Sequence, residues 1–493
     1  MDSSINYNEW YKLDNAAKIF PAVSTDINTN IFRISAWLYE DVDKEILQKA
    51  LEKILPRFPS FSAKLRMGFF WYFLDHNANK PIVREEPAQL YQKMRPQNEN
   101  GFLFRIFYYE KRISLEMFHS LSDGYGGLEF LKSLLFHYLE LKGYDMKSNN
   151  KVRTATSPYS LRELEDSFFI NYEKSSLSAM KDELAYHIPG ITFIQGGSGL
   201  ISGECESDKM NALAKSNNVT MGEYITAVYI YSILNTQPSV YNSKKPISVF
   251  VPVNLRRFFK SETLRNFSSF AKVRVDAYKK TYTFEELLLL VKEQMAQQLQ
   301  KDVLTKKMSS CVSAERVMFF RLIPLIIKIP VMRFFYRLLG EKLTTSSFSN
   351  MGKVDLPDSM MPYIDKFDFS MSATRQAHIN LAMGSYNNKL IICTTRRIIE
   401  TQTVSYFYRF LSEKIDMNIT SNSWEEENYI EAPKNSTKIK ESKIIKKSKI
   451  EMKKNEKQLK KAQNKNKNNI SIALQKTQIK HEDSNEGDEK NVL

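Results

Sequence analysis

The chain has 493 residues, of which 42% are hydrophobic and 12% aromatic, so two or three folded domains fit its length. Its formal net charge is +15, but the segment after Pro433 alone holds 17 lysines against 8 acidic residues. The first 433 residues, with 54 basic and 48 acidic side chains, are only mildly basic. We therefore expect no specific nucleic-acid partner for the body of the protein.

The three cysteines lie far apart and form no CxxC pair, which indicates neither a disulfide framework nor a zinc site. The chain does not open on a basic stretch followed by an apolar run, so we expect no secretory signal and a cytoplasmic location. The most apolar segment, residues 319–339, contains several arginines and lysines, each of which costs about 2.5–3.5 kcal/mol at the middle of a bilayer. We expect two short helices there, broken at Pro330. Their apolar sides either pack in the core or line a tunnel, with lipid contact as a third alternative.

Strand and helix patterns alternate along the first part of the chain. They predict strands at 30–39, 69–75 and 112–118 and helices at 43–58 and 128–141. The pattern weakens after residue 143, and residues 195–199, QGGSG, have the composition of a linker. We place a boundary near residue 185 and assign residues 1–185 to a first domain.

A second run of the same kind follows this boundary. It predicts strands at 199–206 and 247–254, a helix from Ser207, two helices that begin with the capping boxes Thr220–Glu223 and Thr283–Glu286, a hairpin that turns at Asn387 and Asn388, and a helix at 402–415. We assign residues 186–430 to a second domain. Residues 431–493 are rich in lysine and lack aromatic side chains, which predicts a disordered tail.

The stretch FHSLSDGYGG, Phe118–Gly127, joins a predicted strand to a predicted helix. It places His119 at the end of a strand, and the pKa of an imidazole, about 6.5, suits proton transfer near neutral pH. Asp123 either orients this histidine or pairs with an arginine that fixes the loop, while the glycines from Gly124 onward permit close approaches. The alternatives are an ordinary half-buried histidine in a plain turn and, with less weight, a metal site. No further ligands stand at metal-binding spacing, so we expect no metal.

The sequence lacks the motifs of two other classes of enzyme. No G-x-S-x-G elbow of a serine hydrolase and no G-x-x-x-x-G-K-[ST] phosphate-binding loop occur. Serine hydrolysis, nucleotide hydrolysis and redox chemistry on a dinucleotide fold are therefore not expected.

HSLSDG followed by YGGLEFL resembles the HxxxDG signature of the CoA-dependent acyltransferase superfamily, which includes chloramphenicol acetyltransferase, alcohol acetyltransferases and condensation domains. Three later stretches, VPVNLRRFF, LRNFSSF and SSFSNMGKV, stand in the right order and are similar to the alcohol O-acetyltransferase branch. The resemblance covers roughly residues 8–420. It implies an α/β fold of two chloramphenicol acetyltransferase-like domains, with the active-site tunnel between them.

The resemblance also implies roles for the loop residues. His119 is the general base that takes the proton of an acceptor hydroxyl, which attacks the acyl thioester directly, without a covalent intermediate. Asp123 and Gly124 belong to the same catalytic motif, and Asp123 is mainly structural. It should pair with Arg256 or Arg257, because a buried carboxylate without a partner is costly.

The stretch SFSNMG offers hydrogen-bond donors for the oxyanion or for substrate. The candidates are Ser347, Ser349 and Asn350. A strand end with a turn at Gly352 explains the same letters nearly as well. For Asn266, in LRNF, a place in the tunnel wall and a place in a turn stay equally open.

These observations predict an O-acyltransferase that moves an acetyl or other short acyl group from acyl-CoA, as co-substrate, to an alcohol, with no bound cofactor. The alternatives are a condensation-like transferase that uses carrier-bound acyl groups and a non-catalytic binding protein of the same fold. Phe118 stands where condensation domains usually carry a second histidine, which counts against the first alternative. Weak contact with a membrane surface stays open, as do the acceptor and the oligomeric state.

Overall fold

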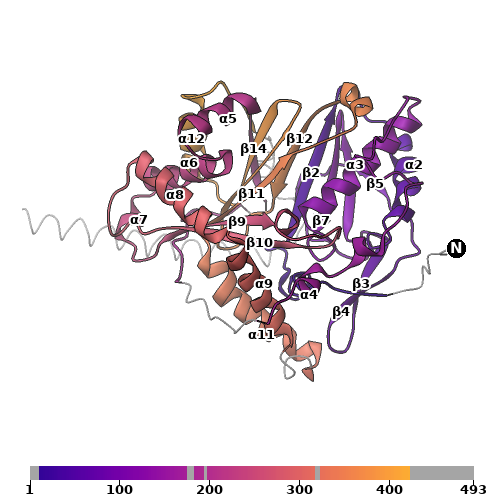
Figure 1. The fold of residues 1–493 in the computed structure, drawn as a ribbon, viewed down its shortest axis with the longest axis horizontal. Coiled ribbons are helices and arrows are strands. Elements are labelled where there is room, and N and C mark those ends of the chain that lie inside the picture. The colour runs from indigo at the N-terminus through magenta and orange to yellow at the C-terminus, as the bar shows by residue number, and fades with distance from the viewer. Residues whose placement is uncertain (1–9, 175–182, 194–196, 317–321, 422–493) are drawn as a thin grey trace, which may run out of the picture. The chain divides into compact units, whose positions relative to one another are not determined.

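The computed structural model describes residues 10–174, 183–193, 197–316 and 322–421 (Figure 1). Two mixed sheets dominate it, and helices cover them. The predicted tail, 431–493, and part of the predicted linker, residues 195 and 196, lie outside the described residues.

The first sheet has five strands in the order β12-β2-β7-β6-β5. These are β12 (Ile364–Met371), β2 (Ile31–Leu38), β7 (Arg112–Phe118), β6 (Phe104–Tyr109) and β5 (Val83–Glu85). All neighbours are antiparallel except β5 and β6. Helices α2 (Lys44–Ile54) and α3 (Gly124–Leu141) pack on each other and against this sheet (Figure 1). The Asp43 side chain caps α2, and apolar residues recur along both helices, which explains why they form and where they are buried.

The second sheet has seven strands in the order β10-β9-β11-β13-β14-β8-β15. These are β10 (Ser268–Val275), β9 (Ile247–Asn254), β11 (Ser346–Lys353), β13 (Ile379–Tyr386), β14 (Lys389–Arg396), β8 (Gly199–Glu206) and β15 (Asn418–Ser421). Strand β11 runs parallel to β9 and β13, and the other pairs are antiparallel. The helices of this half are α5 (Ser207–Ser216), α6 (Met221–Thr236), α8 (Phe284–Gln298), α9 (Lys301–Arg316) and α12 (Gln402–Ser412).

A small third sheet and several short helices complete the described chain. The sheet consists of β1 (Tyr11–Lys12), β4 (Tyr72–His76) and β3 (Ala63–Met67). The remaining helices are α1 (Phe20–Val23), α4 (Ser167–Ile170), α7 (Ser239–Asn242) and α11 (Leu325–Phe335). No helix in the described part of the chain combines the length and the apolar character needed to cross a bilayer.

Most of the elements predicted from the sequence are confirmed within a few residues. Strand β8 has the predicted bounds, and β9 ends at Asn254 as predicted. Helices α6 and α8 begin with the two predicted capping boxes, in which each threonine side chain and each N3 glutamate bond the opposite backbone amide. The β13–β14 hairpin turns at Asn387 and Asn388, whose φ angles of 47° and 59° are those of a tight turn.

Two predictions about apolar segments are wrong. The strand expected at 69–75 starts only at Tyr72, because Phe69 and Phe70 belong to the turn between β3 and β4. The helix expected to break at Pro330 continues through it from Leu325 to Phe335. Pro330 frees the carbonyl of Ile326, and this residue is exposed, so water can satisfy that carbonyl without a break in the helix.

Candidate active site

A cavity of about 500 Å³ lies between the two large sheets. Its walls come from β2 and β12 on one side, from β9, β10 and β11 on the other, and from the loop that follows β7. Most of the lining is apolar, with a small number of polar groups, as in sites for small organic molecules.

His119 stands in this wall, half-buried, directly after β7. Its ring stacks on Phe20, with 5.1 Å between the ring centroids, and meets Phe32 at 4.8 Å and a tilt of 54°. Its backbone amide donates to the carbonyl of Asn30 at 3.0 Å. These contacts fix the ring plane, so the imidazole is positioned before any ligand arrives.

Asn266 determines which ring nitrogen of His119 carries the hydrogen. The Nδ2 group of Asn266 donates to the carbonyl of His119 at 2.9 Å and to Asp14 Oδ2 at 3.1 Å, which fixes the orientation of the amide. Its Oδ1 therefore faces His119 Nδ1 at 3.5 Å, a long contact that requires a hydrogen on Nδ1. With the hydrogen on Nδ1, Nε2 is the ring nitrogen that can accept a proton, as a general base requires. Asn266 is buried and is not among the residues that line the cavity, but it positions His119, which is.

Burial keeps His119 neutral. Loss of water around the ring lowers the pKa of His119 below its ordinary value of 6.5, and the hydrogen bonds with Asn266 and with the backbone of Ser122 and the charge of Asp123 only partly oppose this. A neutral imidazole accepts a proton at physiological pH.

Asp123 bonds to the loop's surroundings, not to the His119 ring. Its Oδ2 accepts a hydrogen bond from Arg256 Nη1 at 2.7 Å and one from the backbone amide of Phe267 at 2.9 Å. Its Oδ1 accepts from the amide of Gly126 and so caps helix α3. The carboxylate therefore joins the loop after β7, the start of α3 and the segment after β9 into one rigid support.

The two arginine candidates lie in different places. Arg256 packs over the ring of Tyr125 at 4.5 Å and also donates from Nε to the carbonyl of Thr263 at 2.9 Å, so it is held on several sides. Arg257 is exposed and lines the cavity, with Nη2 close to Gly352. The structure thus pairs Asp123 with Arg256, while Arg257 stands at the edge of the cavity.

The glycines of the loop are needed for close packing. A Cβ on Gly126 would lie 2.1 Å from the carbonyl oxygen of Leu264, and one on Gly124 would lie 2.7 Å from Met351 Sδ. Neither glycine has a positive φ angle. The backbone of Leu264 cannot move as a methionine side chain can, so Gly126 is the stricter requirement.

The predicted oxyanion candidates also line the cavity. Ser347 and Ser349 stand two residues apart on β11 and so project to one face of the strand, opposite the buried Phe348. Asn350 is more exposed, and its Oδ1 accepts a hydrogen bond from the amide of Gly352 at 2.8 Å. Gly352 has a φ of 78°, so both interpretations of SFSNMG describe the segment: serines on the cavity wall, then a glycine turn.

Glu341 is a polar group in the cavity wall that the sequence did not point to. Its side chain is buried, and its Oε1 has no hydrogen-bond partner among the described residues. Burial raises the pKa of Glu341, while Arg337 and Arg375 oppose the shift. An unsatisfied carboxyl oxygen in a cavity wall is available to a polar group of a ligand.

Asp14, Phe20 and Phe32 were also missed. Each contacts His119 or Asn266 from about ninety or more residues away in sequence, and no local motif links them. The sequence signals at the site were the HxxxDG motif and the stretches VPVNLRRFF, LRNFSSF and SSFSNMGKV, and none of them includes Asp14, Phe20 or Phe32.

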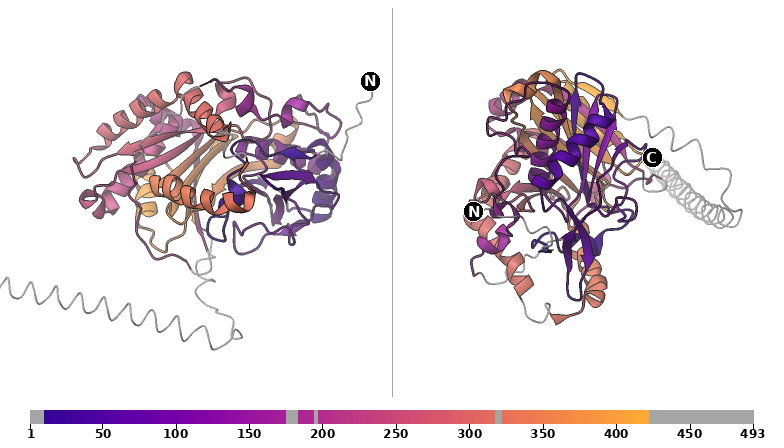
Figure 2. Two further views of the ribbon diagram at one scale, coloured as in Figure 1. Left: turned by 90° about the horizontal axis from the view of Figure 1, so that it is seen from below. Right: turned by 90° about the vertical axis from the view of Figure 1, so that its right-hand side faces the viewer.

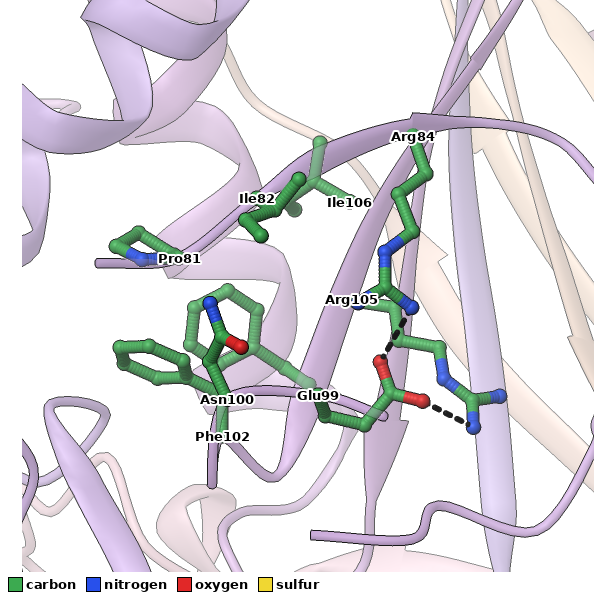
Figure 3. Close-up of a pocket in the computed structure, with 9 residues that line it drawn as sticks. Pro81, Ile82, Arg84, Glu99, Asn100, Phe102, Arg105 and Ile106 are labelled. Carbon is green, nitrogen blue, oxygen red and sulfur yellow. Dashed lines mark hydrogen bonds and ion pairs between the residues drawn. The ribbon is translucent and has the colours of Figure 1, made fainter. Parts of the chain in front are cut away.

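Outside the cavity of His119, a charged cluster lies at the β5 edge of the five-stranded sheet (Figure 3). Glu99 joins Arg84 at 3.1 Å and Arg105 at 2.8 Å beside a hollow of about 10 Å³. That hollow holds about one water molecule, and the same three side chains also line a wider cavity of about 410 Å³. Among the described residues, no group of three or more potential metal ligands is found.

Comparison with known proteins gives matches only at the level of structure. No family model matches the chain, and no curated protein matches it. The trichothecene 15-O-acetyltransferase TRI3 of Fusarium sporotrichioides is 11% identical, with a TM-score of 0.57 over 82% of this chain and 94% of that chain. TRI101 of F. graminearum, solved with coenzyme A and T-2 mycotoxin, is 8% identical, with a TM-score of 0.57 over 83% of this chain and 99% of that chain.

A third similar structure is the condensation domain of the Monacolin K polyketide synthase MokA, which is 12% identical, with a TM-score of 0.51 over 82% of this chain and 96% of that chain. The chain has the fold of these acetyltransferases and condensation domains. The predicted fold class, two chloramphenicol acetyltransferase-like α/β domains, is thereby confirmed.

Proposed function

We propose that the protein is an acyl-CoA-dependent O-acyltransferase that moves an acetyl or other short acyl group to an alcohol. One observation carries the proposal: His119 is a neutral, oriented imidazole in the wall of a cavity large enough for a small organic substrate. The fold agrees with this function, and TRI101, a protein of similar structure, has been solved in complex with coenzyme A and T-2 mycotoxin.

The proposed reaction has one tetrahedral intermediate. His119 Nε2 removes the proton of the acceptor hydroxyl while the hydroxyl oxygen forms a bond to the thioester carbonyl carbon. The carbonyl π electrons move to its oxygen, and they return when the carbon–sulfur bond breaks. The imidazolium then gives its proton to the departing CoA sulfur, which leaves ester, free thiol and neutral histidine.

The developing oxyanion needs hydrogen-bond donors. The hydroxyls of Ser347 and Ser349 are our candidates, because both side chains stand on the cavity wall. Asn350 is the third, although the turn at Gly352 already uses its side-chain oxygen. We assign Asp123, Gly124 and Arg256 a supporting role, in which they hold the loop that carries His119.

The test measures thiol release from acetyl-CoA in the presence of a panel of alcohols. His119→Ala is expected to lower the rate about 10²–10⁴-fold, the usual contribution of a general base. His119→Asn serves as a second variant that fills more of the space between Phe20 and Phe32. His76→Ala is the matched control, because this histidine lies on β4, outside the cavity wall.

The alternatives predict different results. Turnover with acyl groups on a carrier protein but not on CoA would favour a condensation-like transferase. Acyl transfer at the wild-type rate by both His119 variants would refute the proposed mechanism. Absence of turnover with every donor and acceptor, combined with binding of acyl-CoA, would favour a non-catalytic binding protein.

A further inference from the structure

The helix α11 presents apolar side chains to the solvent. Its inward face is formed by residues such as Leu325 and Lys328, which are buried. The outward face of a surface helix is ordinarily polar. Here most of the outward side chains of residues 322–338 are large and apolar, with Ile326 76% exposed and Phe334 62% exposed.

The tip of the β3–β4 hairpin adds further apolar side chains beside this helix. Phe69 is 70% exposed, and its carbonyl accepts a hydrogen bond from the amide of Leu325 at 2.8 Å. Lys328 Nζ donates to the carbonyl of Phe70 at 3.0 Å and lies 3.8 Å from the ring centroid of Trp71. Helix and hairpin are therefore tied together, and Figure 2, right, shows them side by side.

We call this combined surface the apolar face. Its members are exposed hydrophobic side chains of the two elements: Met67, Phe69, Phe70, Leu322, Ile326, Ile327, Val331, Phe334, Phe335 and Leu338. Single exposed apolar residues are common, but a contiguous group of this size marks a surface that is covered in use.

The charges on the apolar face are of one sign. Residues 322–340 include Lys328, Arg333 and Arg337 and no acidic residue. Arg66 of the hairpin is paired with Asp75 at 3.3 Å, so the positive charge of the face comes from the helix. Lys328 is turned inward, while Arg333 and Arg337 are exposed. A second copy seated on this face by two-fold symmetry would bring these arginines toward their own copies, which disfavours a homodimer.

We propose that the apolar face docks on the surface of a bilayer that contains anionic lipids. Exposed phenylalanines and aliphatic side chains enter the interface between headgroups and acyl chains, and the exposed arginines meet the lipid phosphates. The same helix continues into Tyr336 and Gly340, which line the cavity of His119, so a docked bilayer lies next to the candidate active site.

The test is flotation of the full-length protein with vesicles of phosphatidylcholine alone or with 30 mol% phosphatidylglycerol added. The variant Phe69→Ser/Ile326→Ser/Phe334→Ser removes three of the most exposed members of the face. Its matched control is Leu161→Ser/Ile191→Ser/Leu289→Ser, three apolar residues that are 78%, 67% and 57% exposed on other parts of the surface. All six side chains are exposed, so unchanged thermal unfolding is expected for both triple variants.

The wild type and the control variant are expected to float with the anionic vesicles, and the face variant is expected to lose at least ten-fold in apparent affinity. Arg333→Gln/Arg337→Gln should weaken binding to anionic vesicles while leaving the weaker binding to pure phosphatidylcholine unchanged. Because every variant keeps the lysine-rich residues 434–493, equal flotation of the face variant and the wild type would assign binding to that segment and overturn the proposal. Absence of flotation by the wild type would overturn it too, as would a dimer that only the face variant loses.

Discussion

Replacing Asp123 with asparagine is expected to destabilise the protein by about 3 kcal/mol. The side chains of Asp123 and Arg256 are 8% and 7% exposed, and their charged atoms are 2.7 Å apart. Removing one partner of such a buried pair leaves the other charge without compensation, which costs about 3–5 kcal/mol. Asparagine keeps an oxygen for the amide of Gly126, so the helix cap is retained, and we expect the lower end of that range.

Equilibrium unfolding in urea measures this loss, with a double-mutant cycle to isolate the pair. Arg256→Gln alone should also destabilise, whereas Asp123→Asn combined with Arg256→Gln should recover part of the loss, since neither charge is then left alone. The matched control is Asp26→Asn. Asp26 pairs with Arg95 at 3.1 Å, but these side chains are 71% and 60% exposed, so about 1 kcal/mol or less is expected.

Two results would refute the reasoning. A free energy of unfolding within about 0.5 kcal/mol of the wild type for Asp123→Asn would mean that the pair does not brace the loop. Loss of acyl transfer at unchanged stability would place Asp123 in direct contact with the chemistry of His119.

Further predictions concern pH and packing. Because burial lowers the pKa of His119 and protonation blocks Nε2, kcat/KM should fall with decreasing pH with a midpoint below about 6.5, and a midpoint above 7 in a pH–rate profile would contradict this. Burial raises the pKa of Glu341 in the folded protein. As pH rises above the ordinary carboxyl pKa of 4.5, the free energy of unfolding of the wild type should therefore fall relative to that of Glu341→Gln. The fall should reach about 1–3 kcal/mol once the carboxyl is ionised. Melting temperatures at pH 4 and pH 8 measure this difference, and equal differences at both pH values would count against it. Gly126→Ala should destabilise the protein by about 1–3 kcal/mol because the added Cβ meets the backbone of Leu264. The control is Gly222→Ala in helix α6, where the nearest atom to the added Cβ, Asn350 Nδ2, is 3.6 Å away. This variant should change the free energy of unfolding by about 1 kcal/mol or less. Equal melting temperatures of these two variants would refute the packing argument.

Elements and site residues could be predicted from the sequence where they depend on residues that are close together in the chain. The capping boxes at Thr220 and Thr283 each depend on residues three positions apart, so helices α6 and α8 could be located from their first turns. The HxxxDG motif likewise holds His119 and Asp123 in one loop between a strand and a helix. Such signals do not depend on the rest of the fold.

The remaining features depend on contacts between distant segments. The Nδ1 tautomer of His119 is set by Asn266, and the orientation of Asn266 is set by Asp14, more than 250 residues earlier. No periodicity connects these three residues, so the sequence left Asn266 open and gave no role to Asp14. The prediction for the segment 322–338 was wrong for a different reason. Its apolar pattern favoured burial in the core, but a pattern of hydrophobicity does not say whether protein or another apolar partner covers the helix.

The partner of His119 also bears on the proposed reaction. In a serine hydrolase triad a carboxylate contacts the imidazole and stabilises its protonated form. Here the contact is a neutral amide oxygen, and the nearest acidic groups act through Asn266 or across the loop. Burial lowers the pKa of His119, and the neutral amide opposes this only in part. The low pKa suits both proton transfers: the ring is neutral before it meets the alcohol, and once protonated it is acidic enough to give its proton to a thiolate, whose thiol has a pKa of about 8.5. A carboxylate in the place of Asn266 Oδ1 would hold the proton more firmly and would slow its transfer to the leaving sulfur.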